Sequence, residues 1–190
     1  MSDPNTGAGA IDAHAPALLS RFGSPLYVYD ETTLRARCRA LKTAVPLDRT
    51  AILYAAKANT NPRLLAMIRA EGLRMDAVSL GEVEVGLRAG FRPDEISYNG
   101  NNVPADELAA VLAHGVHVSV DSLAQLDRAT RLAPGGAFGL RVNPDVGAGH
   151  HEHVITGGPD AKFGVAPAEV KAAVALAHGR GARIDGLHQH

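Results

Sequence analysis

The sequence lacks tryptophan and has a single cysteine, Cys38, among its 190 residues. Aromatic residues make up only 4% of the chain, and its formal net charge is -1. A lone cysteine cannot form an internal disulfide, which fits a reducing compartment. A surface that binds nucleic acid needs surplus positive charge or stacking rings, so this composition argues against such a partner.

Long apolar runs are also missing. No stretch approaches the ~20 apolar residues of a membrane-spanning helix, and Met1–Ala10 lacks the basic and apolar regions of a signal peptide. Hydrophobic residues nevertheless make up 46% of the chain and charged residues 21%, both near globular averages. The sequence therefore predicts a cytoplasmic protein with a buried core and without a membrane among its partners.

Short apolar runs alternate with stretches of helical character through most of the chain. Such alternation, bounded by Gly, Pro and Asn, is typical of βα units with a parallel sheet. Strands are predicted at Ile52–Ala56, Arg74–Ser79, Glu95–Tyr98, Val116–Val120, Ala137–Asn143 and Ile184–His190. Helices are predicted at Pro62–Glu71, Gly81–Ala89, Ala105–His114, Ser122–Leu132 and Ala168–His178, and a long loop at Pro144–Phe163.

The N-terminal part has a different character. Met1 to about Ala13 is small and polar, which predicts disorder, and Ala15–Phe22 is a candidate short helix. Leu26–Tyr29 has the composition of a strand, and Asp30 is a candidate N-cap for a helix at Glu31–Ala44. We therefore divide the chain into an N-terminus (1–24), a strand and helix leading into the main domain (25–46), and the main domain (47–190).

Polar residues stand at the end of every strand predicted in the main domain. A (β/α)8 barrel gathers functional residues at the C-terminal ends of several strands, whereas an open doubly wound sheet uses one crevice. The absence of a G-x-G-x-x-G motif also weakens the doubly wound alternative. The strand-end residues are Lys57, Ser79, Asn99, Asp121, Arg141 with Asn143, and His188 with His190.

The fold class predicted is thus α/β, a TIM barrel that is incomplete here. About six of the eight strands of such a barrel are recognisable, and six strands cannot close it. We therefore expect the chain to be the N-terminal part of a longer protein.

Lys57 ends the apolar run Ile52–Asn59. If this run is a buried strand, Leu53, Ala55 and Lys57 share one face, where an ammonium group is costly unless its pKa falls or it is bonded. Two interpretations follow. The lysine side chain reaches water, as most do, or its amine is a desolvated nucleophile that forms a Schiff base.

Three further charged residues each allow a structural and a functional interpretation. Asp76 is either a hydrogen-bonded carboxylate near a strand end or a group that sets the charge around a cofactor or Lys57. Glu82 is expected to face solvent in the first turn of a helix, with a site role as the alternative. Arg141 interrupts an apolar strand and needs a partner, either Asp121 or Asp76 in an ion pair, or a ligand.

Histidines are the usual ligands of a metal, and this chain has nine. His150, His151 and His153 lie in the predicted long loop, whereas His188 and His190 share a strand face. No cysteine or carboxylate pattern nearby completes a coordination sphere, so we predict no metal site.

Six segments together resemble the fold type III pyridoxal-phosphate decarboxylases, whose barrel is of the alanine racemase-like type. They are Pro25–Asp30, Tyr54–Asn59, Asp76–Ser79 with Gly81-Glu82, Leu140–Asp145, His150–Gly164 and Gly186–His190. Within them, Ile155–Gly164 resembles the diaminopimelate branch more than the ornithine branch. Two small departures are Leu80, where the family pattern has glycine, and Gln189 between the two histidines.

The resemblance implies that pyridoxal 5'-phosphate forms a Schiff base with Lys57 and that His190 stacks on its ring. It also places Asp76, Glu82 and Arg141 around the cofactor. Lys162 and Asn143 are weaker candidates.

The diaminopimelate branch implies decarboxylation of meso-diaminopimelate to L-lysine, a small-molecule substrate, and a homodimer in the full-length protein. The family's C-terminal β domain is absent from this sequence, so we expect the chain alone to be inactive. Two alternatives remain. One is a decarboxylase of ornithine, arginine or carboxynorspermidine, and the other is a non-catalytic barrel that binds pyridoxal phosphate.

Overall fold

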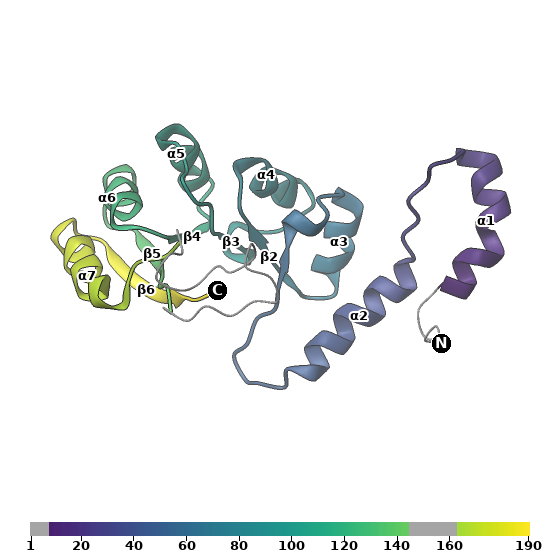
Figure 1. Cartoon of the computed structure of the whole chain (residues 1–190), viewed down its shortest axis with the longest axis horizontal. Coiled ribbons are helices and arrows are strands. Elements are labelled where there is room, and N and C mark those ends of the chain that lie inside the picture. The colour runs from purple at the N-terminus through teal and green to yellow at the C-terminus, as the bar shows by residue number, and fades with distance from the viewer. Residues whose placement is uncertain (1–7, 145–162) are drawn as a thin grey trace.

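One parallel sheet organises the protein, whose computed structural model describes residues 8–144 and 163–190. Its strands lie side by side in chain order (Figure 1). In a doubly wound sheet the order of the strands reverses at a switch point, whereas strands in consecutive order form the wall of a barrel. The strands are β1 (Leu53–Ala55), β2 (Arg74–Ala77), β3 (Ile96–Tyr98), β4 (His117–Val120), β5 (Ala137–Arg141) and β6 (Arg183–His188).

A helix precedes or follows each strand, and the helices cover the outer face of the curved sheet (Figure 1). They are α3 (Pro62–Ala70), α4 (Leu80–Arg88), α5 (Ala105–Ala113), α6 (Leu123–Leu132) and α7 (Val170–Gly179). Short 3-10 turns, which the sequence analysis missed, are η1 (Ala56–Ala58), η2 (Pro93–Glu95) and η4 (Pro167–Glu169). The incomplete (β/α)8 barrel is confirmed, and strand and helix positions differ from the predicted ones by a few residues.

The hydrophobic core lies between the sheet and its helices. Met75, Val118 and Phe138 are at most 1% exposed, and each alternates along its strand with a residue of the opposite face. Gly86 of α4 lets the helix approach closely, because a Cβ there would lie 2.6 Å from the Met75 sulfur. The apolar side chains on the outer face of the sheet therefore hold the helices in place.

Two helices precede the barrel, α1 (Ala8–Phe22) and α2 (Glu31–Ala44). The predicted bounds of α2 are confirmed, and the Asp30 carboxylate caps it by accepting a 2.6 Å hydrogen bond from the Thr33 amide. Helix α1 begins at Ala8, so the prediction of disorder up to Ala13 was wrong for residues 8–13. Among the described residues, no helix is both long and apolar enough to cross a lipid bilayer.

The strand predicted at residues 26–29 was also wrong. The backbone there belongs to no strand, and Tyr27 is 87% exposed. A strand needs a partner for its backbone groups, and none of the described strands pairs with this segment. Most of the predicted long loop, residues 145–162, lies outside the described residues.

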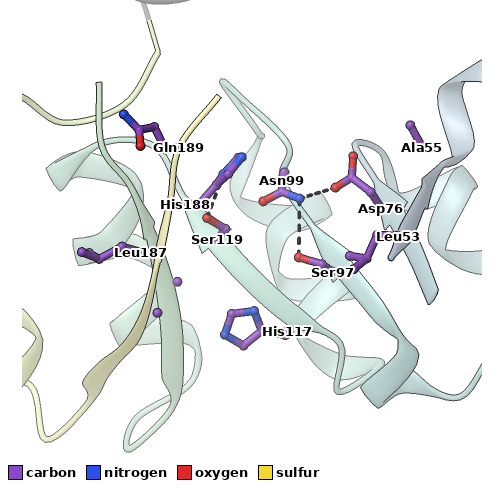
Figure 2. A pocket seen from close by; sticks show the side chains of 12 residues that line it. Leu53, Ala55, Asp76, Ser97, Asn99, His117, Ser119, Leu187, His188 and Gln189 are labelled. Atoms are coloured by element: carbon purple, nitrogen blue, oxygen red, sulfur yellow. Dashed lines mark hydrogen bonds between the residues drawn. The ribbon is translucent and has the colours of Figure 1, made fainter. Parts of the chain in front are cut away.

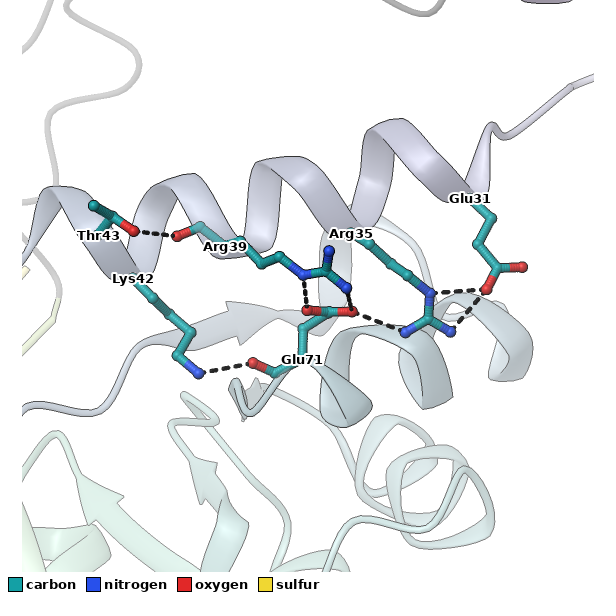
Figure 3. A network of polar contacts seen from close by, with 6 residues as sticks. All are labelled: Glu31, Arg35, Arg39, Lys42, Thr43 and Glu71. Carbon is teal, nitrogen blue, oxygen red and sulfur yellow. Dashed lines mark hydrogen bonds and ion pairs between the residues drawn. The ribbon is translucent and has the colours of Figure 1, made fainter.

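Helix α2 is attached to the barrel by Glu71, which follows α3 (Figure 3). Its carboxylate accepts hydrogen bonds from the Arg39 guanidinium at 2.7 and 2.9 Å and from Arg35 at 3.0 Å. Lys42 donates to the Glu71 carbonyl at 3.0 Å. The Arg39 and Arg35 hydrogen bonds lower the pKa of Glu71 to about 2. Beneath this network, Cys38 is buried in a small apolar cluster with Ile68 and Leu73.

We predict an acid-sensitive contribution of Glu71 to stability. Because folding lowers its pKa from 4.5 to about 2, its stabilisation is complete above pH 4.5 and is lost as the pH falls toward 2. Glu71→Gln should flatten the fall in thermal midpoint over this range. Glu84→Gln, which removes an exposed carboxylate of α4, should leave the wild-type profile unchanged. Parallel profiles for wild type and Glu71→Gln would contradict the prediction.

Candidate cofactor site

A cavity of about 510 Å³ lies on the inner face of the sheet, and all six strands contribute to its lining (Figure 2). Apart from Leu53 and Leu187, the residues that line it have small or polar side chains, in contrast to the apolar residues that face the helices. The lining residues are Leu53, Ala55, Asp76, Ser97, Asn99, His117, Ser119, Gly139, Gly186, Leu187, His188 and Gln189. The structure thus brings residues that are far apart in the chain together around one cavity.

Lys57 does not continue the strand as predicted. It lies in η1, two residues beyond the lining residue Ala55, and its side chain is exposed. The turn is held by buried Ala56, whose carbonyl accepts from the Asn59 amide at 3.0 Å. The Asn59 side chain donates to the Tyr29 hydroxyl at 2.7 Å. The lysine amine is therefore open to a ligand, on a turn fixed from both sides.

Asp76 is the predicted site residue that lines the cavity. It is half-buried on β2, and its carboxylate accepts a hydrogen bond from the Asn99 side-chain amide (Figure 2). Asn99 also lies 3.5 Å from the Ser97 hydroxyl. The Asn99 amide carries no charge, so it does not neutralise the carboxylate. Asp76 can thus attract a cationic group that enters the cavity.

Arg141 ends β5 and is only 7% exposed. In the described part of the chain no ion pair joins it to Asp121 or Asp76, and a contact with a ligand stays a prediction for this residue. Its guanidinium lies 3.5 Å from the Asn101 side-chain oxygen and 5.1 Å from the centre of the Phe163 ring. Burial lowers the pKa of Arg141, and the nearby charge of Asp121 raises it. A buried cation whose partners among the described residues are this weak fits an anionic ligand group.

Glu82 is half-buried rather than facing solvent, so the expectation of an exposed side chain was wrong. Its carboxylate accepts from the Val78 amide at 2.8 Å, and its own amide donates to the Ser79 hydroxyl at 3.3 Å. This is close to a capping box at the start of α4. The contacts fix the turn between β2 and α4, and a direct role for Glu82 at a cofactor stays a prediction.

His190 follows β6 and is exposed. Asn143 donates its backbone amide to Val165 at 2.9 Å, and Lys162 lies outside the described residues. The sequence analysis did not select the cavity residues Ser97, Ser119 and Gln189. For Ser97 and Ser119, alternation with apolar residues was the available signal, but it does not show which face of a strand lines a cavity.

Comparison with known protein families identifies the family to which this chain belongs. The family described as pyridoxal-dependent decarboxylase, pyridoxal binding domain, matches residues 31–190. The chain belongs to the pyridoxal-dependent decarboxylases. Family membership confirms pyridoxal phosphate as the cofactor.

Several relatives of this chain have an assigned reaction. A diaminopimelate decarboxylase of Methanothermobacter thermautotrophicus is 46% identical over 94% of this chain and 42% of that protein. One from Mycobacterium tuberculosis is 36% identical over 91% of this chain and 40% of that protein. The chain therefore spans about two fifths of the length of these curated relatives.

Solved structures of decarboxylases have the same fold. A crystal structure of diaminopimelate decarboxylase superposes with a TM-score of 0.84 at 31% identity, over 94% of this chain and 42% of that one. A Helicobacter pylori diaminopimelate decarboxylase complexed with L-lysine gives 0.83 at 26% identity, over 93% and 46%.

The described residues of this chain fit pyridoxal phosphate. The cofactor presents an aldehyde, a basic ring nitrogen and a phosphate group. The chain offers an exposed amine at Lys57, a carboxylate with neutral partners at Asp76, and a buried guanidinium with weak partners at Arg141. These three groups are chemically complementary to the cofactor.

We predict that Arg141 contributes little to folding stability. Arg141→Met should leave the free energy of unfolding within about 1 kcal/mol of wild type, because the desolvation cost of the cation disappears with its weak contacts. Arg69→Met, which breaks a 2.9 Å ion pair with Glu95, should lower it. Urea unfolding measures both. A loss of more than about 3 kcal/mol for Arg141→Met would show that the guanidinium is needed for the fold.

Proposed function

We propose that the protein decarboxylates meso-diaminopimelate to L-lysine, and that this chain forms the part that binds pyridoxal phosphate. The observation that carries the proposal is Lys57. It is an exposed amine on a fixed turn at the end of the first barrel strand, in a chain up to 46% identical to diaminopimelate decarboxylases. The L-lysine in the Helicobacter pylori structure supports the same product for that relative.

Lys57 would hold the cofactor through its amine, because the side chain is exposed while the backbone around it is anchored. Asp76 would attract a positively charged nitrogen, and Arg141 would bind an anionic group, either a phosphate or a carboxylate. His190 would stack on the ring, and Glu82 would act through the turn that it caps.

Bound pyridoxal phosphate supplies an electron sink for the pair of electrons left when carbon dioxide departs. The chain's own residues do the rest of the work. Lys57 supplies an amine that a substrate amine can displace and that can hold or deliver a proton at its Nζ. Arg141 is already desolvated, so it can orient an anion without first losing its own water shell.

The organisation of the protein is part of the proposal. Residues 1–24 and 25–46 would lead into the barrel, and residues 47–190 would form its cofactor-binding wall. A C-terminal β domain and a homodimer would complete the active enzyme. Two relatives are longer than this chain, which covers 40–42% of them, and their additional length leaves room for such a domain.

We predict that pyridoxal phosphate becomes covalently attached at Lys57. After incubation with the cofactor and reduction with borohydride, peptide mapping should find the pyridoxyl group on Lys57 in wild type and in Lys171→Ala, a change on the surface of α7. Lys57→Ala should lose the label, because no other amine occupies that turn. An unchanged pattern of labelling in Lys57→Ala would contradict the proposed attachment.

We predict that the native protein, purified from its source cells, releases carbon dioxide from meso-diaminopimelate in preference to ornithine and arginine. Release of labelled gas from each carboxyl-labelled amino acid measures the preference. A faster reaction with ornithine or arginine would assign another substrate branch. Cofactor attachment at Lys57 without any gas release would indicate a non-catalytic pyridoxal-binding barrel.

A further inference from the structure

Strand β6 has one residue more than β5 in the middle of the ladder that joins them. Phe138 of β5 pairs with Ile184 of β6. The next residue of β5, Gly139, pairs with Gly186. Asp185 lies between these two pairs and is the extra residue of a β-bulge. A bulge of this kind changes the direction of the side chains that follow it.

The bulge decides which side chain of β6 meets Ser119 on the inner face of the sheet. With the bulge, His188 pairs with Arg141 and lines the cavity. Leu187 is 71% exposed and lies on the opposite side of the β6 ribbon from His188 (Figure 2). In a ladder without the bulge, Leu187 would pair with Arg141 in place of His188. Because side chains alternate along a strand, His188 would then turn to the outer face.

A hydrogen bond across β5 holds the extra residue in its place. His117 Nε2 on β4 lies 2.9 Å from Asp185 Oδ1. A carboxylate only accepts, so the imidazole N–H donates. On β4, Ser119 pairs with Gly139, and His117 stands two residues earlier. The bond therefore keeps Asp185 back from the position opposite Gly139, which it would occupy in a ladder without the bulge.

Gly139 lets side chains of β4 reach β6, because it has no side chain of its own. A Cβ there would lie 3.1 Å from His117 Cε1 and 3.2 Å from Ser119 Oγ. Beyond this glycine, Ser119 Oγ lies 3.3 Å from His188 Nδ1 (Figure 2). Strand β4 thus contacts β6 at the bulge itself, through Asp185, and again at His188, where the changed direction of the side chains takes effect.

The bond between His117 and Asp185 adds little to the overall stability of the fold. The two side chains are 43% and 35% exposed, and pairs with this much contact with water contribute little to the free energy of folding. The bond does distinguish two registers of β6. Without the bulge, Asp185 would lie beside Ser119, two residues further along β4 than its present partner.

We propose that His117 and Asp185 are positioning residues that hold the bulge in β6 and so turn His188 toward the cofactor cavity. The inference rests on the proposed function, in which His190, two residues further on, would stack on the cofactor ring. Loss of the bulge would place Leu187 at the inner face in place of His188 and would move every later residue by one position.

The register of β6 is tested by cysteine cross-linking in the whole protein without cofactor. Arg141→Cys is combined with either His188→Cys or Leu187→Cys, and peptide mapping after mild oxidation identifies the joined cysteines. The 141–188 disulfide should predominate, because these residues are register partners and the side chain at 187 leaves the other face. Adding His117→Ala should shift the yield toward the 141–187 disulfide. Unchanged yields would overturn the proposal.

Deletion of Asp185 provides the matched rescue. Without this residue, Ile184 and Gly186 can keep their present partners in a regular ladder, so His188 keeps its face. In the deleted protein, His117→Ala should therefore no longer change the cross-links. An equal change with and without Asp185 would contradict a role in holding the bulge. Should His117→Ala alone fail to fold, folding restored by the deletion supports the proposal, and continued failure refutes it.

A conservative change separates the hydrogen bond from the charge. Asp185→Asn keeps an oxygen that can accept from His117, so it should give the wild-type cross-links, whereas Asp185→Ala should behave like His117→Ala. Wild-type cross-links in Asp185→Ala would show that the side chain does not hold the bulge.

The link to the cofactor is tested by equilibrium dialysis with pyridoxal phosphate. His117→Ala should bind about fivefold more weakly than wild type, the equivalent of about one lost hydrogen bond. Deletion of Asp185 should restore the affinity of this variant. His178→Ala, an exposed change on the outer helix α7, serves as the control and should bind like wild type. Full affinity in His117→Ala despite shifted cross-links would refute the positioning role at the cofactor.

The two hypotheses fail in different ways. Absence of a pyridoxyl group on Lys57 in the wild type refutes the proposed function. In that case the cross-links still decide whether His117 and Asp185 hold the bulge. Normal attachment at Lys57, together with cross-links that His117→Ala does not change, refutes the positioning role alone.

Discussion

The alternation of side chains along six parallel strands is the constraint on which both the core and the cavity depend. Met75 packs against the helices while its neighbour Asp76 lines the cavity, and Val118 and Ser119 divide in the same way. A shift of one residue in register would exchange the two faces, placing a carboxylate among the helices and apolar groups in the cavity. Strand register therefore sets stability and ligand chemistry together.

Asp76 in the cavity and Arg141 at the end of β5 each have an uncharged amide as a partner among the described residues. Asp76 is hydrogen-bonded by Asn99, and Arg141 lies near Asn101. Amide groups reduce the cost of removing these charges from water without cancelling them. Such groups are in place before a ligand arrives, which is what electrostatic preorganisation of a catalytic site requires.

Sequence reasoning was accurate where the signal is local, and it failed where a distant partner decides. Asp30 and the bounds of α2 follow from a cap and a helical repeat. Residues 26–29 have the composition of a strand, but none of the described strands pairs with them. Lys57 was expected on a strand, yet the strand ends before it and Lys57 lies in a turn. The contacts of Asn59 with Ala56 and Tyr29 hold this turn. Glu82 was expected in solvent, whereas its carboxylate accepts from the Val78 amide just before α4, whose cap is the Ser79 hydroxyl.

The sequence by itself determined the alternation of strands and helices, the polar strand ends and the lysine motif, because these depend on residues close together in the chain. Only the tertiary structure decided which distant side chains meet. Glu71 binds Arg35 and Arg39 of another helix, and Ser119 contacts His188, which is 69 residues away. Such contacts depend on strand order and register, and no periodicity within one segment records them.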